Sequence, residues 1–126
     1  MHYPDELKYT KDHEWIRVEG NIGTIGITDH AQGELGDVVY IDIPDSAAVL
    51  SIGDSFGTIE AVKTVADMYA PVSGKIIEVN GALNDAPETV NTNPYGAGWM
   101  IKMELANPSE ISELMDVNAY KALIGE

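Results

Sequence analysis

The sequence contains no cysteine. This absence excludes disulfide bonds, thiolate nucleophiles and zinc sites built on cysteine ligands. If the protein takes part in sulfur chemistry, the reactive sulfur therefore has to come with a cofactor.

Basic residues are also scarce. The 126 residues include 7 Lys and Arg against 21 Asp and Glu, and the formal net charge is −14. Proteins that bind a phosphate backbone need clustered Lys and Arg, so we expect neither nucleic acid nor an anionic membrane as a partner. The hydrophobic content of 44% is ordinary for a globular protein, which assigns the acidity to a folded surface and not to disorder.

Long hydrophobic segments are missing as well. The longest apolar run, residues 47–50, is far shorter than the ~20 residues that span a bilayer. The amino terminus carries Asp5 and Glu6, whereas a signal peptide needs positive charge there. We therefore expect a location in the cytoplasm, or in the mitochondrial matrix if a transit peptide has been removed. For the oligomeric state, a monomer is the default expectation.

Catalytic and metal-binding motifs are weak or absent. Residues 13–17 begin like the helix of a zinc protease, but Arg17 stands where the second His ligand is required. His2, His13 and His30 are far apart, and we expect each to be a surface or hydrogen-bonding residue. No phosphate-binding loop, dinucleotide fingerprint or nucleophile elbow occurs. The sequence thus predicts no metal site and no catalytic residue.

The first two-thirds of the chain alternates between apolar and polar residues with period two and is interrupted by glycine, which indicates short strands joined by turns. Gly20 lies in a predicted hairpin loop, residues 19–21. Thr28 is placed to cap one helical turn, and Pro44 to end a strand. We predict seven or more strands, including residues 15–18, 22–27, 38–43, 56–61, 65–70, 75–79 and 99–105.

From Asn107 the periodicity becomes helical. Asn107, Pro108 and Glu110 form a helix-start signature, and the predicted helix ends near Asp116. A second predicted helix, residues 119–124, is stopped by Gly125. We therefore expect one domain over residues 1–126, mainly β over 1–106 with a helical appendix over 107–126.

Two short segments recur along the chain. Gly-Thr-Ile occurs at residues 23–25 and 57–59, and residues 36–39 are similar to residues 74–77. A duplicated hairpin would explain both recurrences. Chance repetition of common strand-opening sequences would explain them equally well.

Lys63 is the one basic residue between Gly57 and Gly74. It stands between two predicted strands, where a hairpin has to turn, and a lysine at a tight hairpin tip projects its amine away from the fold. An enzyme could reach such an amine. Taken alone, Lys63 could also be an ordinary solubilising or edge-protecting lysine.

The surrounding residues match a known pattern. Residues 60–63, Glu-Ala-Val-Lys, and residues 67–74, Asp-Met-Tyr-Ala-Pro-Val-Ser-Gly, closely resemble the lipoyl attachment segment of the H proteins of the glycine cleavage system. Further motifs of that family occur in the same order, at residues 7–9, 13–15, 26–32, 35–39, 90–91, 94–96 and 98–99. The resemblance therefore covers essentially the whole chain.

This resemblance implies a mainly β fold, a flattened barrel-sandwich hybrid of two antiparallel sheets with quasi two-fold symmetry and short C-terminal helices. It also implies a non-catalytic carrier whose lipoate is joined by an amide to Lys63. Its implied partners are a pyridoxal-phosphate glycine decarboxylase, a tetrahydrofolate-dependent aminomethyltransferase, dihydrolipoamide dehydrogenase and a lipoyl-attaching enzyme. The missing cysteines fit this role, because both reactive sulfurs would arrive on the lipoate.

The resemblance also implies roles for residues around the lysine. In related lipoyl domains the acids near the lysine help the attaching enzyme to select it, and Glu60 and Asp67 occupy those positions. Val62 and Thr64 flank Lys63 and belong to the same recognition segment. We expect the acidic pair to steer docking and fix its register.

A second group of residues is implied in docking of the loaded arm. The aminomethyl-loaded arm of the family folds back against the protein, where carboxylates would stabilise its cationic amine. Glu14 and His30 lie in matching motifs and are the candidates. Asp12 and Glu34 adjoin those motifs, but the family varies there and no role is transferred to them.

Two other functions stay open from the sequence. H-like proteins can donate lipoyl groups in a relay that lipoylates 2-oxoacid dehydrogenases, and this role would use the same Lys63. An unmodified acidic binding domain, by contrast, would leave Lys63 free.

Overall fold

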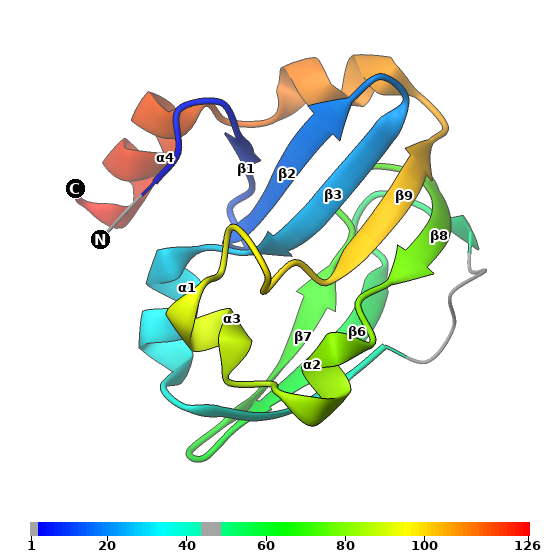
Figure 1. The fold of residues 1–126 in the computed structure, drawn as a ribbon. Coiled ribbons are helices and arrows are strands. Elements are labelled where there is room, and N and C mark those ends of the chain that lie inside the picture. The colour runs from blue at the N-terminus through cyan, green and yellow to red at the C-terminus, as the bar shows by residue number, and fades with distance from the viewer. Residues whose placement is uncertain (1–2, 44–48) are drawn as a thin grey trace.

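The computed structural model describes residues 3–43 and 49–126, and Figure 1 shows the course of the chain through its strands and helices. The strands are β1 (Lys8–Tyr9), β2 (Glu14–Glu19), β3 (Ile22–Ile27), β4 (Val38–Asp42), β5 (Val49–Leu50), β6 (Ser55–Ala61), β7 (Val65–Tyr69), β8 (Gly74–Val79) and β9 (Ile101–Leu105). The helices are α1 (Asp29–Leu35), α2 (Ala82–Asp85), α3 (Thr89–Thr92), the 3₁₀ helix η1 (Pro108–Glu113) and α4 (Val117–Ile124).

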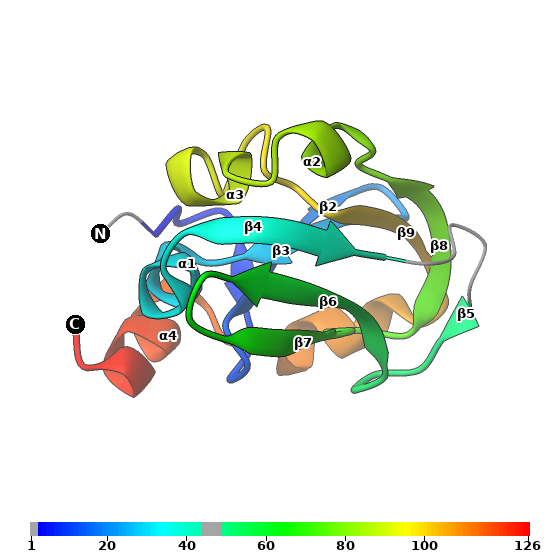
Figure 2. The same ribbon diagram turned by 90° about the horizontal axis from the view of Figure 1, so that it is seen from below.

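The strands form two antiparallel sheets. A six-stranded sheet has the order β1-β2-β3-β9-β8-β5, and a three-stranded sheet has the order β4-β6-β7. The two sheets lie one behind the other in Figure 1, and Figure 2 shows the three-stranded sheet in front. The prediction of two antiparallel sheets with short helices is confirmed, although no closed barrel forms among the described residues.

The predicted strands appear close to their predicted bounds. The loop of the first hairpin contains Gly20, which adopts a φ of +61° in the turn between β2 and β3. The last strand begins two residues later than predicted, because the Trp99 N–H donates to the Gly96 carbonyl in a turn. Pro44, expected to end a strand, lies outside the described residues, as does His2.

The helices differ more from the prediction. Thr28 caps a helix as expected, its hydroxyl accepting from the Ala31 N–H, but α1 runs for 7 residues and not for one turn. The helix predicted up to residue 116 is a short 3₁₀ helix, because the chain leaves it to pair Met115 with Tyr9 through backbone bonds of 2.8 and 3.0 Å. The helix predicted over 119–124 begins earlier, at Val117, where Asp116 caps it.

The core divides into two clusters. The larger cluster fills the space between the sheets and includes Ile25, Ile59 and Ile76. The smaller one is rich in aromatic side chains: the Tyr120 ring of α4 stacks on Tyr9 at 4.7 Å, beside the buried Trp15. This second cluster holds the C-terminal helix against β1 and β2.

Candidate functional site

Lys63 lies at the tip of the β6–β7 hairpin, where the sequence predicts it. Val62, Lys63 and Thr64 connect the two strands, and all three side chains are exposed. The Ala61 N–H donates to the Thr64 carbonyl at 2.8 Å and closes the turn. The amine is therefore carried on a tight turn that an enzyme can approach.

A second loop supports this tip from outside the hairpin. The Val62 N–H donates to the Asp37 carbonyl at 3.0 Å, so the tip is bonded to the chain between α1 and β4. The Lys63 side chain lies over Gly36, which has a φ of +79°; a Cβ on Gly36 would stand 3.4 Å from Lys63 Cε. Glycine suits this position because the left-handed φ strains other residues.

Asn91, in α3, connects the elements beneath the tip. Its side-chain Oδ1 accepts from the Val38 N–H at 2.9 Å, and its Nδ2 donates to the Gly36 carbonyl at 2.8 Å. The same Nδ2 donates to Gln32 Oε1 in α1 at 3.1 Å. Asn91 therefore bonds to both neighbours of Asp37, the residue that accepts from Val62. The sequence assigned this residue no role beyond a family motif.

The predicted recognition residues surround the lysine on the hairpin. Glu60 and Asp67 are exposed, and their side chains project from the outer face of the three-stranded sheet. Asp67 accepts a long hydrogen bond from Thr58 Oγ1 at 3.4 Å across the strands. Lys63 is thus flanked by an acid on each strand of its hairpin.

A small cavity opens at the edge of β7, next to α1 and to the turn that precedes β2. Its volume is about 170 Å³. We call it the edge cavity; it is lined by Asp12, His13, Glu14, Ile27, Ala31, Glu34, Leu35, Ile59, Ala66, Asp67 and Met68. Apolar side chains and carboxylates line it together, and Lys and Arg are missing from the lining.

Glu14 is the most buried acid of this cavity. Its side chain is 2% exposed and accepts hydrogen bonds from the Thr10 hydroxyl at 2.7 Å and from the Tyr69 N–H of β7 at 3.2 Å. Burial raises the pKa of Glu14 to about 7, against the smaller lowering effect of these two hydrogen bonds. Glu14 therefore exchanges a proton near neutral pH.

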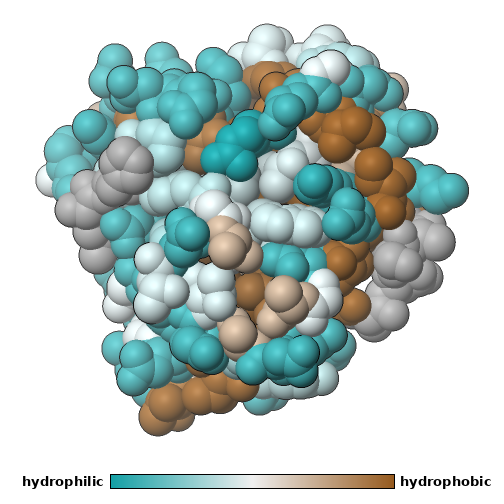
Figure 3. All heavy atoms as spheres, viewed as in Figure 1, coloured by the Kyte–Doolittle hydropathy of each residue, from teal (hydrophilic) through white to brown (hydrophobic). Residues whose placement is uncertain are grey.

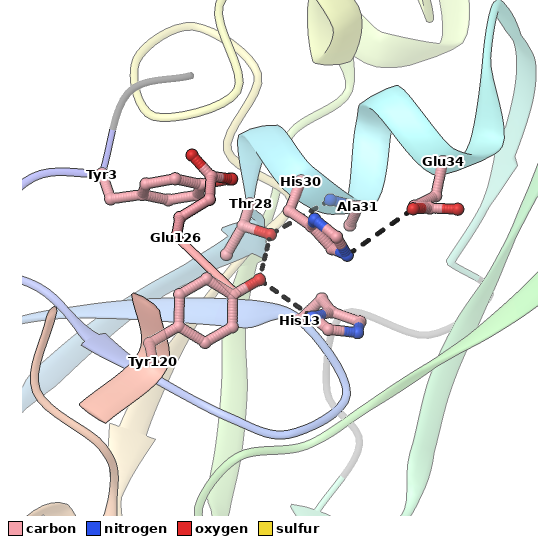
Figure 4. A network of polar contacts seen from close by, with 8 residues as sticks. All are labelled: Tyr3, His13, Thr28, His30, Ala31, Glu34, Tyr120 and Glu126. Carbon is pink, nitrogen blue, oxygen red and sulfur yellow. Dashed lines mark hydrogen bonds and ion pairs between the residues drawn. The ribbon is translucent and has the colours of Figure 1, made fainter. Parts of the chain in front are cut away.

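His30 does not line the edge cavity, but it contacts a residue that does. Its ring lies 4.7 Å from the ring of His13, and its Nε2 is 3.8 Å from Glu34. Figure 4 shows His13 in turn beside Tyr120, whose hydroxyl lies 2.9 Å from His13 Nδ1 and 2.8 Å from the Thr28 hydroxyl. Burial, helped by His30, lowers the pKa of His13. An uncharged His13 presents no positive charge to the cavity.

A larger cavity, of about 340 Å³, lies on the other side of Glu14. It is bounded by β1, the loop at Ile52 and Gly53, and residues 113–115. No residue of β6 or β7 lines it, whereas Ile59, Ala66, Asp67 and Met68 line the edge cavity, so the smaller cavity is the one that adjoins the hairpin.

The structure brings together residues that the sequence left apart. Glu14 and Asp67 share the edge cavity with Asp12 and Glu34, to which the sequence gave no role. No group of three metal-ligating side chains is present within residues 3–43 and 49–126, and no helix there is long and apolar enough to cross a membrane.

The comparisons with known proteins agree with one another. A family model described as glycine cleavage H-protein matches residues 7–126. The chain is 52% identical to the glycine cleavage system H protein of Staphylococcus haemolyticus and 53% identical to that of Staphylococcus saprophyticus, with 100% of each chain aligned. A crystal structure of a glycine cleavage system H protein from Mycobacterium marinum matches with a TM-score of 0.90 and 38% identity, covering 98% of this chain and 100% of the other.

Proposed function

The chain belongs to the glycine cleavage H-protein family, and from this premise we propose that Lys63 is the residue that carries its lipoyl group. The protein is a carrier subunit of the glycine cleavage system and not a catalyst. The observation that carries the assignment to Lys63 is the place of this lysine, exposed on a closed turn that is bonded to a second loop.

Attachment forms one amide bond. The uncharged Lys63 Nζ attacks the carbonyl of an activated lipoyl donor, the activating group leaves, and the amine releases a proton. Glu60, Val62, Thr64 and Asp67 surround this amine and serve its recognition by the attaching enzyme. Glu60 and Asp67 flank a cation on an acidic protein. We therefore expect them to change the rate at which the attaching enzyme associates, and its alignment on the hairpin, more than its affinity.

Lipoate, when bound, would supply a disulfide that accepts the aminomethyl group of glycine. After that group is passed on, the lipoate would be left as a dithiol, which dihydrolipoamide dehydrogenase would reoxidise to the disulfide. We propose that the edge cavity holds the end of this arm, a proposal supported by Ala66 and Asp67, which line the cavity and follow Lys63 closely along the chain into β7. Pockets for drug-sized ligands measure about 300–1,000 Å³, so this cavity would hold the end of the arm and not its whole length.

The lining suits such a group in two ways. Ile27, Ile59 and Met68 offer apolar contact, and the ionised carboxylate of Glu14 binds a cationic amine, while the exposed Asp67 adds negative charge at the edge of the cavity. His30 acts through its contact with His13. Partial burial, helped by the neighbouring His30, lowers the pKa of His13 and so favours the uncharged ring, which does not repel the amine.

The specific partners we propose are the pyridoxal-phosphate glycine decarboxylase, the aminomethyltransferase and dihydrolipoamide dehydrogenase. A tethered arm serves these active sites at high effective concentration and releases no free intermediate. Because the relatives compared above are bacterial, we propose that the carrier works in the cytoplasm.

Intact mass spectrometry tests the assignment. The protein is coexpressed with a lipoyl ligase, and its mass should rise by one lipoyl group. Lys63→Arg should abolish this increase. Lys75→Arg, which alters an exposed lysine in β8, should leave it unchanged. A modification that survives Lys63→Arg would contradict the proposal.

A further inference from the structure

The outer face of the three-stranded sheet exposes large apolar side chains beside Lys63. Val39 and Tyr40 of β4 are 52% and 50% exposed, and Val62 and Val65 of the hairpin are 76% and 60% exposed. In Figure 3 a hydrophobic surface is visible at the lower end of the molecule, where the β6–β7 hairpin lies in Figure 1. Contiguous apolar exposure of this kind marks interaction surfaces.

The strand register places two of these side chains, Tyr40 and Val65, in one row with Glu60. Tyr40 pairs with Glu60, and Glu60 pairs with Val65, so one row crosses β4, β6 and β7 on the same face. The register shifts between Val38 and Tyr40, and this irregularity leaves both Val39 and Tyr40 exposed. The apolar surface therefore extends from the hairpin tip onto the neighbouring strand.

Negative charge accompanies the apolar row. The next row of the same face is Asp42, Thr58 and Asp67. The sequences of β4, β6 and β7 contain three acids, Asp42, Glu60 and Asp67, but no Lys or Arg. Lys63 at the tip is the cation beside this face. A partner that fits it presents an apolar socket ringed by Lys and Arg.

We propose that Val39, Tyr40, Glu60, Val62 and Val65, which we call the β4 face, form a docking surface for the enzyme that acylates Lys63. The proposal rests on Lys63 being the lipoyl site. An enzyme that acylates Nζ has to bring its own active site to the hairpin tip, so it covers the residues next to that tip. Enzymes that act on the far end of a lipoyl arm work at a distance from the tip. Recognition thus extends beyond the hairpin, with Tyr40 as its anchor on β4, since Tyr is enriched among residues that dominate interface energetics.

Kinetics of acylation by a purified lipoyl ligase test the β4 face. Initial rates are measured by intact mass at several concentrations of the unmodified carrier. Tyr40→Thr should raise KM by about tenfold, which corresponds to about 1.4 kcal/mol of lost interaction. It should leave kcat unchanged, because the turn that holds Lys63 is intact, and Tyr40→Phe should restore most of the wild-type KM.

The controls are exposed apolar residues of the other sheet. Ile77→Thr in β8 and Val49→Thr in β5 alter side chains that are 46% and 78% exposed, and neither should change KM. These substitutions are on the surface, so all variants should fold with unfolding free energies within about 0.5 kcal/mol of wild type.

Each outcome separates the two proposals. If the wild-type chain is acylated at Lys63 and Tyr40→Thr has the wild-type KM, the β4 face is not the docking surface, while the role of Lys63 stands. If Tyr40→Thr impairs only the reaction with glycine decarboxylase, the face serves a different partner and this proposal is wrong. If the wild-type chain is not acylated, the proposed function itself fails.

Discussion

The two long hairpins of this protein differ in what their turns are made of. The β2–β3 hairpin turns at Gly20 and Asn21, two exposed residues, of which glycine supplies the positive φ. The β6–β7 hairpin turns at Val62, Lys63 and Thr64, two of which are β-branched. Turn chemistry accounts for the first set, since Gly and Asn are the residues that such turns favour.

Turn chemistry does not account for the second set. Val62 is 76% exposed, and β-branched residues suit strands better than turns. Both turns are bonded to another part of the chain: the Val62 N–H donates to the Asp37 carbonyl, and the Asn21 carbonyl accepts from the Leu105 N–H of β9. The residues of the β2–β3 turn are explained by backbone conformation, whereas the exposed Val62 and Lys63 of the β6–β7 turn are explained by a partner that binds there.

The largest expected effect concerns Glu14, the side chain that joins the two hairpins. It belongs to β2 and accepts from the Tyr69 N–H of β7. Because burial raises its pKa from 4.5 to about 7, the folded state binds more protons than the unfolded state between these pH values. The free energy of unfolding should therefore fall as pH rises through this window, by about 3 kcal/mol relative to Glu14→Gln.

Urea unfolding of both proteins at pH 5 and pH 8 measures this difference. Glu19→Gln is the matched control, because Glu19 lies in the same strand and is exposed. It should follow the wild-type pH dependence. If wild type and Glu14→Gln change in parallel with pH, Glu14 does not titrate differently on unfolding.

A second prediction compares the two Gly-Thr-Ile segments. A Cβ on Gly57 in β6 would stand 2.6 Å from the backbone oxygen of Asp42, whereas a Cβ on Gly23 in β3 would stand 2.7 Å from the end of the Ile16 side chain. A side-chain end moves more easily than a paired strand. We expect Gly57→Ala to lower the free energy of unfolding by about 2 kcal/mol and Gly23→Ala by about 1 kcal/mol.

Thermal and urea unfolding of the two variants check this order. Equal losses would mean that the β4 backbone adapts as easily as Ile16, and a larger loss for Gly23→Ala would reverse the comparison.

Both Gly-Thr-Ile segments were visible in the sequence, and so were the hairpins that contain them. Alternation and turn residues are local signals, and they placed β2, β3, β6 and β7 to within a residue or so. The short elements β1, β5, α2 and α3 were missed, because two to four residues carry too little periodicity. The internal duplication stays a prediction, although the two Gly-Thr-Ile copies lie in different sheets.

The hairpin was the part of the site that local sequence could predict, whereas Glu14 and His30 were named only through the family resemblance. Lys63 and its flanking acids are neighbours in the chain, so a motif could identify them. The edge cavity is different, because its lining comes from the turn before β2, from α1 and from β7. Nothing local distinguishes Glu14 from the other carboxylates of an acidic chain. Its burial and its bond to Tyr69 arise only when β2 and β7 meet.

The smallest expected effect concerns Asn91, which supports the loop that accepts the bond from the β6–β7 turn. Asn91→Ala removes the acceptor of the Val38 N–H and the donor to the Gly36 carbonyl, on either side of Asp37. Water can replace part of these bonds at a half-buried residue, so we expect a loss of about 1 kcal/mol in the free energy of unfolding. Asn21→Ala, on the exposed β2–β3 turn, should cost less than about 0.5 kcal/mol.

Amide hydrogen exchange locates the effect of Asn91→Ala. The Val62 N–H, which donates to Asp37, should exchange about fivefold faster, as a local loss of about 1 kcal/mol requires. The Leu105 N–H, which donates to the Asn21 carbonyl at the other turn, should exchange at its wild-type rate. Equal acceleration at both amides would mean that the effect is not confined to the β6–β7 tip. An unchanged Val62 would mean that the tip holds its place without Asn91, so that the bond to Asp37 needs no support from α3.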